Sequence, residues 1–380
     1  MANPPPYANI TGISRAAMKD NAQITLADYN GNARPGELVV DQTNDNLYVG
    51  NSNGSLTLIA SGSGTETWAT LGDKNNASGP DSIALGTSAG TSQGLGAVAI
   101  GALAGQTQGS QAVAIGETAG QTAQGIETVS IGYSAGFSSQ GNTAVAIGSG
   151  AGAISQGGSA VALGRLAGAN VQGTQAVAIG ELAGNTTQGN SAVAVGYSAG
   201  SNTQGVSAVA IGKQAGETTQ GNYSVAVGQQ AGTNTQGASA VAVGYLAGTT
   251  SQGASAVAIG LNTGSTGQGT YSVAIGAGAG YNGQGNNSVA IGLDTGLTSQ
   301  GTNSVAIGKQ AGETSQAANS IILNATGSAL NQTTANTFTV KPVRAVASVT
   351  FAAPTSGSVP AGFSPMYYNP TTGEIIVITT

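Results

Sequence analysis

A short repeated unit occupies most of the chain and limits its possible folds more than any other feature. From Ile83 to Asn324, the motif Val-Ala-Ile-Gly or a close variant recurs at steps of 15 residues twice and of 16 residues thereafter. The closing glycines of the motif are Gly86, Gly101, Gly116, Gly132, Gly148, Gly164, Gly180, Gly196, Gly212, Gly228, Gly244, Gly260, Gly276, Gly292 and Gly308. A period this short and regular is the signature of a solenoid, in which each repeat packs on its neighbours.

Three further positions recur with the same period as the motif. A second glycine follows four residues after the first, from Gly90 to Gly312, and a glutamine follows it in every repeat. A third glycine comes directly after the glutamine, except in the last repeat, where Ala317 replaces it. Such frequent glycine excludes a helix, because each interior glycine costs about 1 kcal/mol relative to alanine. It suits turns and close backbone approach instead.

The motif alternates small and branched residues, as a β-strand does. Val98 and Ile100 share one face, and Ala97 and Ala99 share the other. We expect the branched residues to fill the interior and the alanine face to lie near a neighbouring chain. We also expect a second short strand that contains the alanine before the second glycine. Each repeat is then one coil of a parallel β-solenoid with two strands and two turns, and fifteen coils at ~4.8 Å each give a rod on the order of 70 Å long.

The recurrent glutamine has two interpretations. It could bind sugar along the rod, or it could form a ladder in which each side-chain amide bonds to the next coil. We favour the ladder, because a contact surface usually varies between repeats and this residue does not. The predicted ladder comprises Gln108, Gln124, Gln140, Gln156, Gln172, Gln188, Gln204, Gln220, Gln236, Gln252, Gln268, Gln284 and Gln300.

The motif resembles the head repeats of trimeric autotransporter adhesins of the YadA type, which have similar Ser-Val-Ala-Ile-Gly sequences. The resemblance is carried by Ser272–Gly276, Ser288–Gly292 and Ser304–Gly308, and by Ser224–Gly228 with valine in place of isoleucine. It covers about two thirds of the chain. It implies an all-β fold, a left-handed parallel β-roll, and assembly as a homotrimer. The 16-residue repeats are slightly longer than is usual in that family, and we expect an enlarged turn between the second glycine and the glutamine.

Variable positions indicate which parts of each coil face solvent. The residues after the first and second glycines differ from repeat to repeat, so two turns of the coil are expected to be exposed. Aromatic residues at these turns are candidates for contact with a receptor, through stacking on sugar rings or packing on protein. They are Tyr133, Phe137, Tyr197, Tyr245 and Tyr281. The alternative is that they are isolated surface aromatics, which are common.

Composition argues against most kinds of chemistry. The chain has no cysteine and no histidine, which removes disulfides, thiol nucleophiles, histidine acid–base catalysis and most transition-metal sites. Its net charge of −6 argues against nucleic-acid binding. We predict no enzyme activity, no cofactor and no metal. A carboxylate pair for glycoside hydrolysis stays open as a minor alternative, since the repeats carry the single acidic residues Glu117, Glu127, Glu181, Glu217, Asp294 and Glu313.

The two ends differ from the repeats. Residues 1–60 contain predicted strands at 24–27, 37–40 and 47–49, and residues 35–50 resemble β modules near the N-termini of bacteriophage fibre proteins. Residues 61–82 read as a linker and cap of the roll, with Trp68 as a plug. Residues 338–344 and 366–375 resemble segments of phage tail spikes and fibres that precede a C-terminal chaperone domain. We therefore predict four parts: an attachment module (1–60), a linker and cap (61–82), the roll (83–324) and a trimerising tip (325–380).

Three functions compete at this stage. The first is a structural fibre on the exterior of a phage virion, which docks to other virion proteins through its N-terminal region and is able to contact a host glycan or protein. The second is a bacterial surface adhesin; residues 1–24 show no secretory signal pattern, and we expect none. The third is an ice-binding solenoid, because serine or threonine precedes the glutamine in eleven of fifteen repeats. That column is interrupted by Ala123, Val171, Gly267 and Gly283. We expect no insertion into a membrane, because no stretch of ~20 residues is apolar throughout.

Overall fold

The structure, a computed structural model, describes residues 38–41, 46–50, 56–60, 78–343, 366–368, 371 and 374–377. Within these residues the regular structure is all β-strand, and no helix is present. The chain divides into two compact units, Met1–Thr70 and Leu71–Thr380. The first unit holds an antiparallel sheet of β1 (Leu38–Asp41), β2 (Asn46–Gly50) and β3 (Leu56–Ala60). Strands β1 and β2 fall on two predicted strands, β3 was not predicted, and the predicted strand at 24–27 lies outside the described residues.

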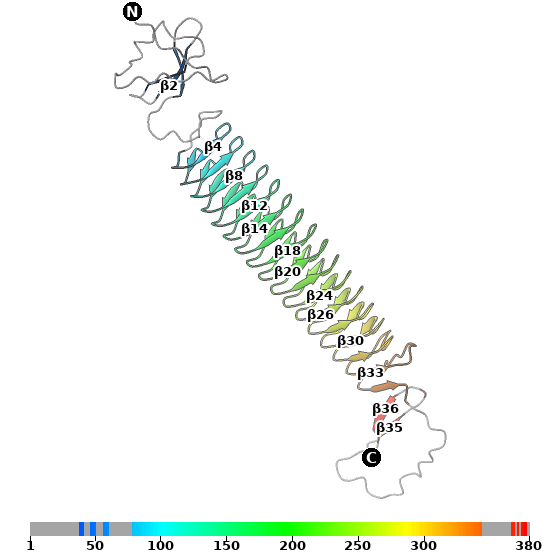
Figure 1. Ribbon diagram of the computed structural model, residues 1–380. Helices are drawn as coiled ribbons and strands as arrows, with labels where there is room; N and C mark the ends of the chain where they lie inside the picture. The colour runs from blue at the N-terminus through cyan, green and yellow to red at the C-terminus, as the bar shows by residue number, and fades with distance from the viewer. Residues whose placement is uncertain are drawn as a thin grey trace, which may run out of the picture. The chain divides into compact units, whose positions relative to one another are not determined.

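The second unit contains a parallel β-solenoid in which successive coils stack along one axis (Figure 1). The motif strands form its first sheet and pair in chain order. They are β4 (Ile83–Leu85), β6 (Val98–Ile100), β8 (Val113–Ile115), β10 (Val129–Ile131), β12 (Val145–Ile147), β14 (Val161–Leu163), β16 (Val177–Ile179), β18 (Val193–Val195), β20 (Val209–Ile211), β22 (Val225–Val227), β24 (Val241–Val243), β26 (Val257–Ile259), β28 (Val273–Ile275), β30 (Val289–Ile291) and β32 (Val305–Ile307). With β33 (Ile321–Asn324), which pairs parallel to β32, they make sixteen coils. The predicted parallel β-solenoid is therefore confirmed.

The second sheet consists of 14 strands of two or three residues, each of which ends at the glutamine of its coil. They are β5 (Ser92–Gln93), β7 (Thr107–Gln108), β9 (Thr122–Gln124), β11 (Ser138–Gln140), β13 (Ile154–Gln156), β15 (Val171–Gln172), β17 (Thr187–Gln188), β19 (Thr203–Gln204), β21 (Thr219–Gln220), β23 (Thr235–Gln236), β25 (Thr250–Gln252), β27 (Thr266–Gln268), β29 (Asn282–Gln284) and β31 (Thr298–Gln300). The prediction that the alanine before the second glycine lies in this strand is wrong. Ala183, for example, lies in the turn that precedes β17.

Equivalent residues of successive coils stack on one another. In β16 and β18, Val177 pairs with Val193 and Ala178 pairs with Ala194. The same register holds along the first sheet. Columns of one residue type therefore run along the rod, which explains why substitutions in the repeat are so restricted.

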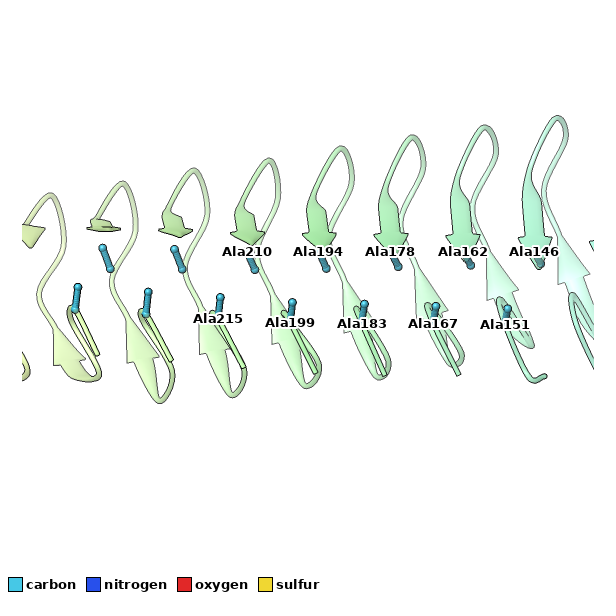
Figure 2. Close-up of a cluster of buried hydrophobic side chains, with 14 of the residues drawn as sticks. Ala146, Ala151, Ala162, Ala167, Ala178, Ala183, Ala194, Ala199, Ala210 and Ala215 are labelled. Carbon is cyan, nitrogen blue, oxygen red and sulfur yellow. The ribbon is translucent and has the colours of Figure 1, made fainter. Parts of the chain in front are cut away.

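The alternation of the motif was predicted correctly, but the prediction of which residues face the interior was wrong. The middle residue of each motif strand, alanine in all but β10, is buried, while the branched residues on either side are half-buried or exposed. Figure 2 shows the alanines of the motif strands facing the alanines of the turns across the interior. Ala178 and Ala183 are both fully buried, whereas Ile179 is 36% exposed. The core is thus built of methyl groups, and valine and isoleucine point outward.

The small cross-section of the coil is the physical reason. A Cβ atom added to Gly184 would lie 2.8 Å from Cδ of Gln188 and 3.3 Å from Cβ of Ala178. The interior therefore lacks room for one further carbon, and protein interiors at this density reject larger side chains. The glutamine side chain, rather than valine and isoleucine as predicted, fills the interior of the coil.

Close stacking explains the motif glycine. At Gly180 the backbone adopts a φ of +123°, and an added Cβ would lie 2.7 Å from the carbonyl oxygen of Gly196 in the next coil. Only glycine permits both this conformation and this approach.

The 16-residue coils accommodate their extra residue in two ways, according to the residue before the glutamine. Where that residue is alanine, serine or glycine, its φ is positive, as at Ser155 (55°). The other residues of this kind are Ala123, Ser139, Ser251, Gly267, Gly283, Ser299 and Ser315. In five successive coils the residue is β-branched and has no positive φ; these are Val171, Thr187, Thr203, Thr219 and Thr235. The left-handed region is less favourable for a β-branched residue, which accounts for the other form of the turn in these five coils. The preference is not absolute, because Thr118 and Thr143 adopt a positive φ in other turns.

The C-terminal end of the solenoid is closed by larger side chains. Ile322 takes the place of the motif alanine in β33 and packs with Ala306, Ala311 and Leu330. Strand β34 (Phe338–Lys341) stacks parallel on β33, and β36 (Glu374–Val377) then pairs antiparallel with β34 and with β35 (Met366–Tyr368). The change to antiparallel pairing ends the stack. The predicted plug at Trp68, at the other end, lies outside the described residues.

Candidate interaction surfaces

A buried column of glutamine side chains crosses the interior of every coil. In all fifteen repeats the Nε2 atom donates a hydrogen bond to the carbonyl oxygen of the first residue in the motif strand. In one coil, Gln188 Nε2 lies 2.8 Å from the oxygen of Val177. The side chain thus joins the two strands of its own coil, so it is placed for a structural role and is shielded from any external ligand.

The same amides also join neighbouring coils, always with Nε2 of one glutamine donating to Oε1 of the next in the chain. The Gln172–Gln188 bond is 3.1 Å long. Direct bonds of this kind link the pairs 93–108, 108–124, 140–156, 156–172, 172–188, 188–204, 220–236, 252–268 and 300–316. Between Gln124 and Gln140 the hydroxyl of Ser130, which replaces the motif alanine, relays the contact. The remaining steps have no direct amide–amide bond, and Oε1 of Gln220, Gln252, Gln284 and Gln300 lacks a partner among the described residues.

An apolar stripe runs along the outside of the first sheet. It consists of the first and third residues of the motif strands and of β33, which are valine, isoleucine or leucine, and we call it the Val/Ile stripe. Among its members Leu163 is 42% exposed and Ile211 is 40% exposed. A monomeric soluble protein rarely exposes a continuous apolar surface of this extent. The stripe is therefore the strongest candidate in the described residues for an interface with other chains.

The aromatic residues singled out in the sequence are dispersed on the surface. Tyr133, Tyr197 and Tyr245 occupy the same turn, but they lie four and three coils apart, since 64 and 48 residues separate them. At ~4.8 Å per coil these gaps are about 19 and 14 Å, too wide for contact between the rings. Tyr133 shares its coil with Phe137, which is half-buried. Tyr281 lies at the turn after the second glycine, in a hollow lined by other residues.

A third exposed turn, between the third glycine and the motif, was overlooked in the sequence. It carries the two most exposed aromatic side chains of the roll, Tyr223 at 63% and Tyr271 at 66%. The signal was present, because this position also varies between repeats, from Gln175 to Ser191 and Asn287.

Charged groups do not gather into a reactive cluster in the described part of the chain. Arg165 pairs with Glu181 on the surface of the next coil. Glu217 and Glu313 each accept a hydrogen bond from a glutamine of their own coil. The described residues contain no group of three or more acidic side chains able to hold a metal ion. Nor do they include a helix with the length and hydropathy needed to span a membrane.

A stacked parallel solenoid with an outward apolar stripe defines a class of elongated repeat fibre. The family model described as the YadA head domain repeat matches residues 71–89, 77–104 and 220–247. No curated protein and no solved structure matches the chain. These segments are therefore similar to the head repeats of YadA-type trimeric adhesins.

Proposed function

We propose that the chain forms the rod of a homotrimeric fibre in which the Val/Ile stripes of three chains pack against one another. The observation that carries this proposal is the stripe itself, which leaves an apolar face in solvent along sixteen coils of a single chain. The methyl-group core offers little apolar burial per residue, so association through the stripe supplies what a lone stack lacks. Three chains, rather than two, follow from the likeness to YadA head repeats.

We further propose that this fibre stands on the exterior of a phage virion and performs no catalysis. The support is the resemblance of residues 35–50 to phage fibre modules, together with the similar C-terminal segments. Residues 1–60 would dock the fibre to other virion proteins, the roll would provide length and stiffness, and residues 325–380 would form the tip. A bacterial surface adhesin is the second candidate, because the repeat match fits it equally well.

Contact with a host surface is a further part of the proposal. Tyr133, Phe137, Tyr197, Tyr245 and Tyr281 are the proposed receptor contacts, to which the more exposed Tyr223 and Tyr271 are added. Their spacing along the rod favours several separate contacts over one continuous aromatic patch.

Localisation of the protein tests the choice between the two candidates. Antibodies raised against the purified roll are applied to phage particles and to cells of the source bacterium, and both are imaged by electron microscopy. We expect gold label on projections from particles, and light scattering of the purified chain at three times 36.4 kDa, about 109 kDa. Label on the bacterial envelope alone contradicts the virion proposal and supports the adhesin.

A further inference from the structure

One coil of the roll carries only alanine and glycine at its exposed turn and leaves a hollow in the surface. The coil after β28 reads Ala277-Gly278-Ala279-Gly280, whereas the coils on either side carry Leu261 and Leu293 at the position of Ala277. The hollow measures about 510 Å³ and is also lined by Tyr281, Leu297 and Thr298. This volume falls within the range of ~300–1,000 Å³ that is usual for small-molecule sites.

Apolar groups form the walls of the hollow. Leu261, Leu293 and Tyr281 are 50%, 46% and 41% exposed, so their side chains stand in solvent around it. An aromatic ring beside aliphatic side chains suits the apolar C–H face of a sugar ring, on which it can stack.

Two polar side chains stand on opposite sides of the hollow without partners. Asn262 and Asp294 occupy the position of Gly278 in the preceding and the following coil. Neither side chain forms a hydrogen bond with another described residue. A Cβ added to Gly278 would lie 2.4 Å from Oδ1 of Asp294, so this carboxylate leans over the glycine and into the hollow. A carboxylate accepts hydrogen bonds from hydroxyl groups, and an amide both donates hydrogen bonds to them and accepts hydrogen bonds from them.

We propose that this hollow is a binding site for a neutral sugar, which stacks on Tyr281 and the leucines and is hydrogen-bonded by Asn262 and Asp294. A purely apolar ligand would desolvate Asp294 without compensation. An acidic sugar would face the same carboxylate on a chain of net charge −6. The site deepens the proposed host contact and rests on the proposed fibre, since the assembled trimer has to leave this turn in solvent.

A variant that fills the hollow provides the sharpest test. Ala277→Leu installs the residue that both neighbouring coils carry at this position, so the coil should fold unchanged. The matched control is Ala102→Leu, at the same position of a coil far from the hollow. Tyr281→Ala removes the stacking ring, and Asp294→Asn removes the charge while keeping a residue that occurs in this column as Asn262.

Saturation-transfer NMR on the full chain measures binding of the methyl glycosides of glucose, galactose, mannose and N-acetylglucosamine, with N-acetylneuraminic acid as the acidic comparison. We expect at least one neutral sugar to bind, and its affinity to fall on the order of tenfold or more in Ala277→Leu and Tyr281→Ala but not in Ala102→Leu. Absence of binding by all four neutral sugars, equal binding by Ala277→Leu, or preference for the acidic sugar overturns the proposal.

Light scattering of the same samples separates failure of this site from failure of the proposed fibre. A trimer that binds no sugar contradicts the site and leaves the fibre standing. A chain that stays monomeric contradicts the fibre, and sugar binding by that monomer, lost in Ala277→Leu, still supports the site.

Discussion

At the scale of single residues, the core of this protein is made from the smallest apolar side chain and one amide. Ala178 and Ala183 supply methyl groups from two sides, and Gln188 fills the remaining space while it bonds both strands. A buried amide is stable only where its donors and acceptors are satisfied. Glutamine has the length to reach across the coil and two N–H groups, which serve the opposite strand and the next coil together.

Replacement of Gln188 by methionine keeps the length and removes the amide. Val177 and Ala192 then lose a donor to their carbonyl oxygens, Gln204 Oε1 loses its donor, and Gln172 Nε2 loses its acceptor. We expect the free energy of unfolding to fall by about 3 kcal/mol, because Gln204 Oε1 is left without a donor and the other three groups each lose one of their hydrogen bonds. Urea denaturation measures the loss, and hydrogen exchange locates it.

The control for this variant is Gln229→Met, since Gln229 is exposed on the surface of the roll. Its stability should change by no more than ~0.5 kcal/mol. Equal stability of the two variants would show that the buried amides contribute packing alone.

Residue patterns in the sequence predicted the coil but did not determine which face of its strands points inward. Period-two alternation establishes that Val177 and Ile179 share a face and that Ala178 lies on the other. It does not establish which face is inside, since that depends on the volume enclosed. Hydrophobicity favours the branched residues for the interior, and the volume taken by Gln188 reverses the choice. The invariant glutamine was the evidence in the sequence that the interior was already occupied.

At the scale of elements, the turn before each glutamine has two forms that the sequence selects. Ser155 has a φ of 55°, whereas Thr203 has no positive φ and lies in a turn of the other form. The difference was not predicted, because serine and threonine in this column have similar polarity and were expected to be equivalent. Their backbone preferences differ, since the added methyl group makes positive φ less favourable for threonine than for serine. Threonine does adopt positive φ in other turns of the roll, at Thr118 (55°) and Thr143 (59°).

Exchange of these two residues tests this account of the turn. Ser155→Thr should destabilise its coil by about 1 kcal/mol, either through strain at positive φ or through conversion of the turn to the other form. Thr203→Ser should be neutral to within ~0.5 kcal/mol, because serine adopts both forms. Hydrogen exchange of the peptides around each site reports the effect. If Thr203→Ser lowers stability as much as Ser155→Thr does, the side chain does not select the form of the turn.

At the scale of the whole molecule, the outward stripe gives a variant that separates assembly from folding. Ile179 is 36% exposed in the single chain, so Ile179→Asp leaves the charge in contact with water and the coil should fold. In the proposed trimer the same charge would be buried without a partner, which is strongly unfavourable. We expect circular dichroism like that of the parent and a molecular mass near 36 kDa by light scattering, compared with 36.4 kDa for one chain.

Thr187→Asp is the matched control on the second sheet, where Thr187 is exposed in the same coil as Ile179. It should assemble like the parent chain. Dissociation by Thr187→Asp together with intact assembly of Ile179→Asp would move the interface to the second sheet. Unfolding of Ile179→Asp would instead show that the stripe contributes to the core of the single chain.

The in-register stacking of equivalent residues has a consequence for how three chains would align. Each stripe repeats itself after one coil, so two stripes offset by one coil, ~4.8 Å, make nearly the same contacts as two stripes in step. The repeats can therefore hold chains together without determining which coil of one lies beside which coil of another. In the proposed trimer that choice would belong to parts of the chain that occur once, such as the end where β36 pairs antiparallel with β34. A single error of alignment there would be copied along the full length of the rod.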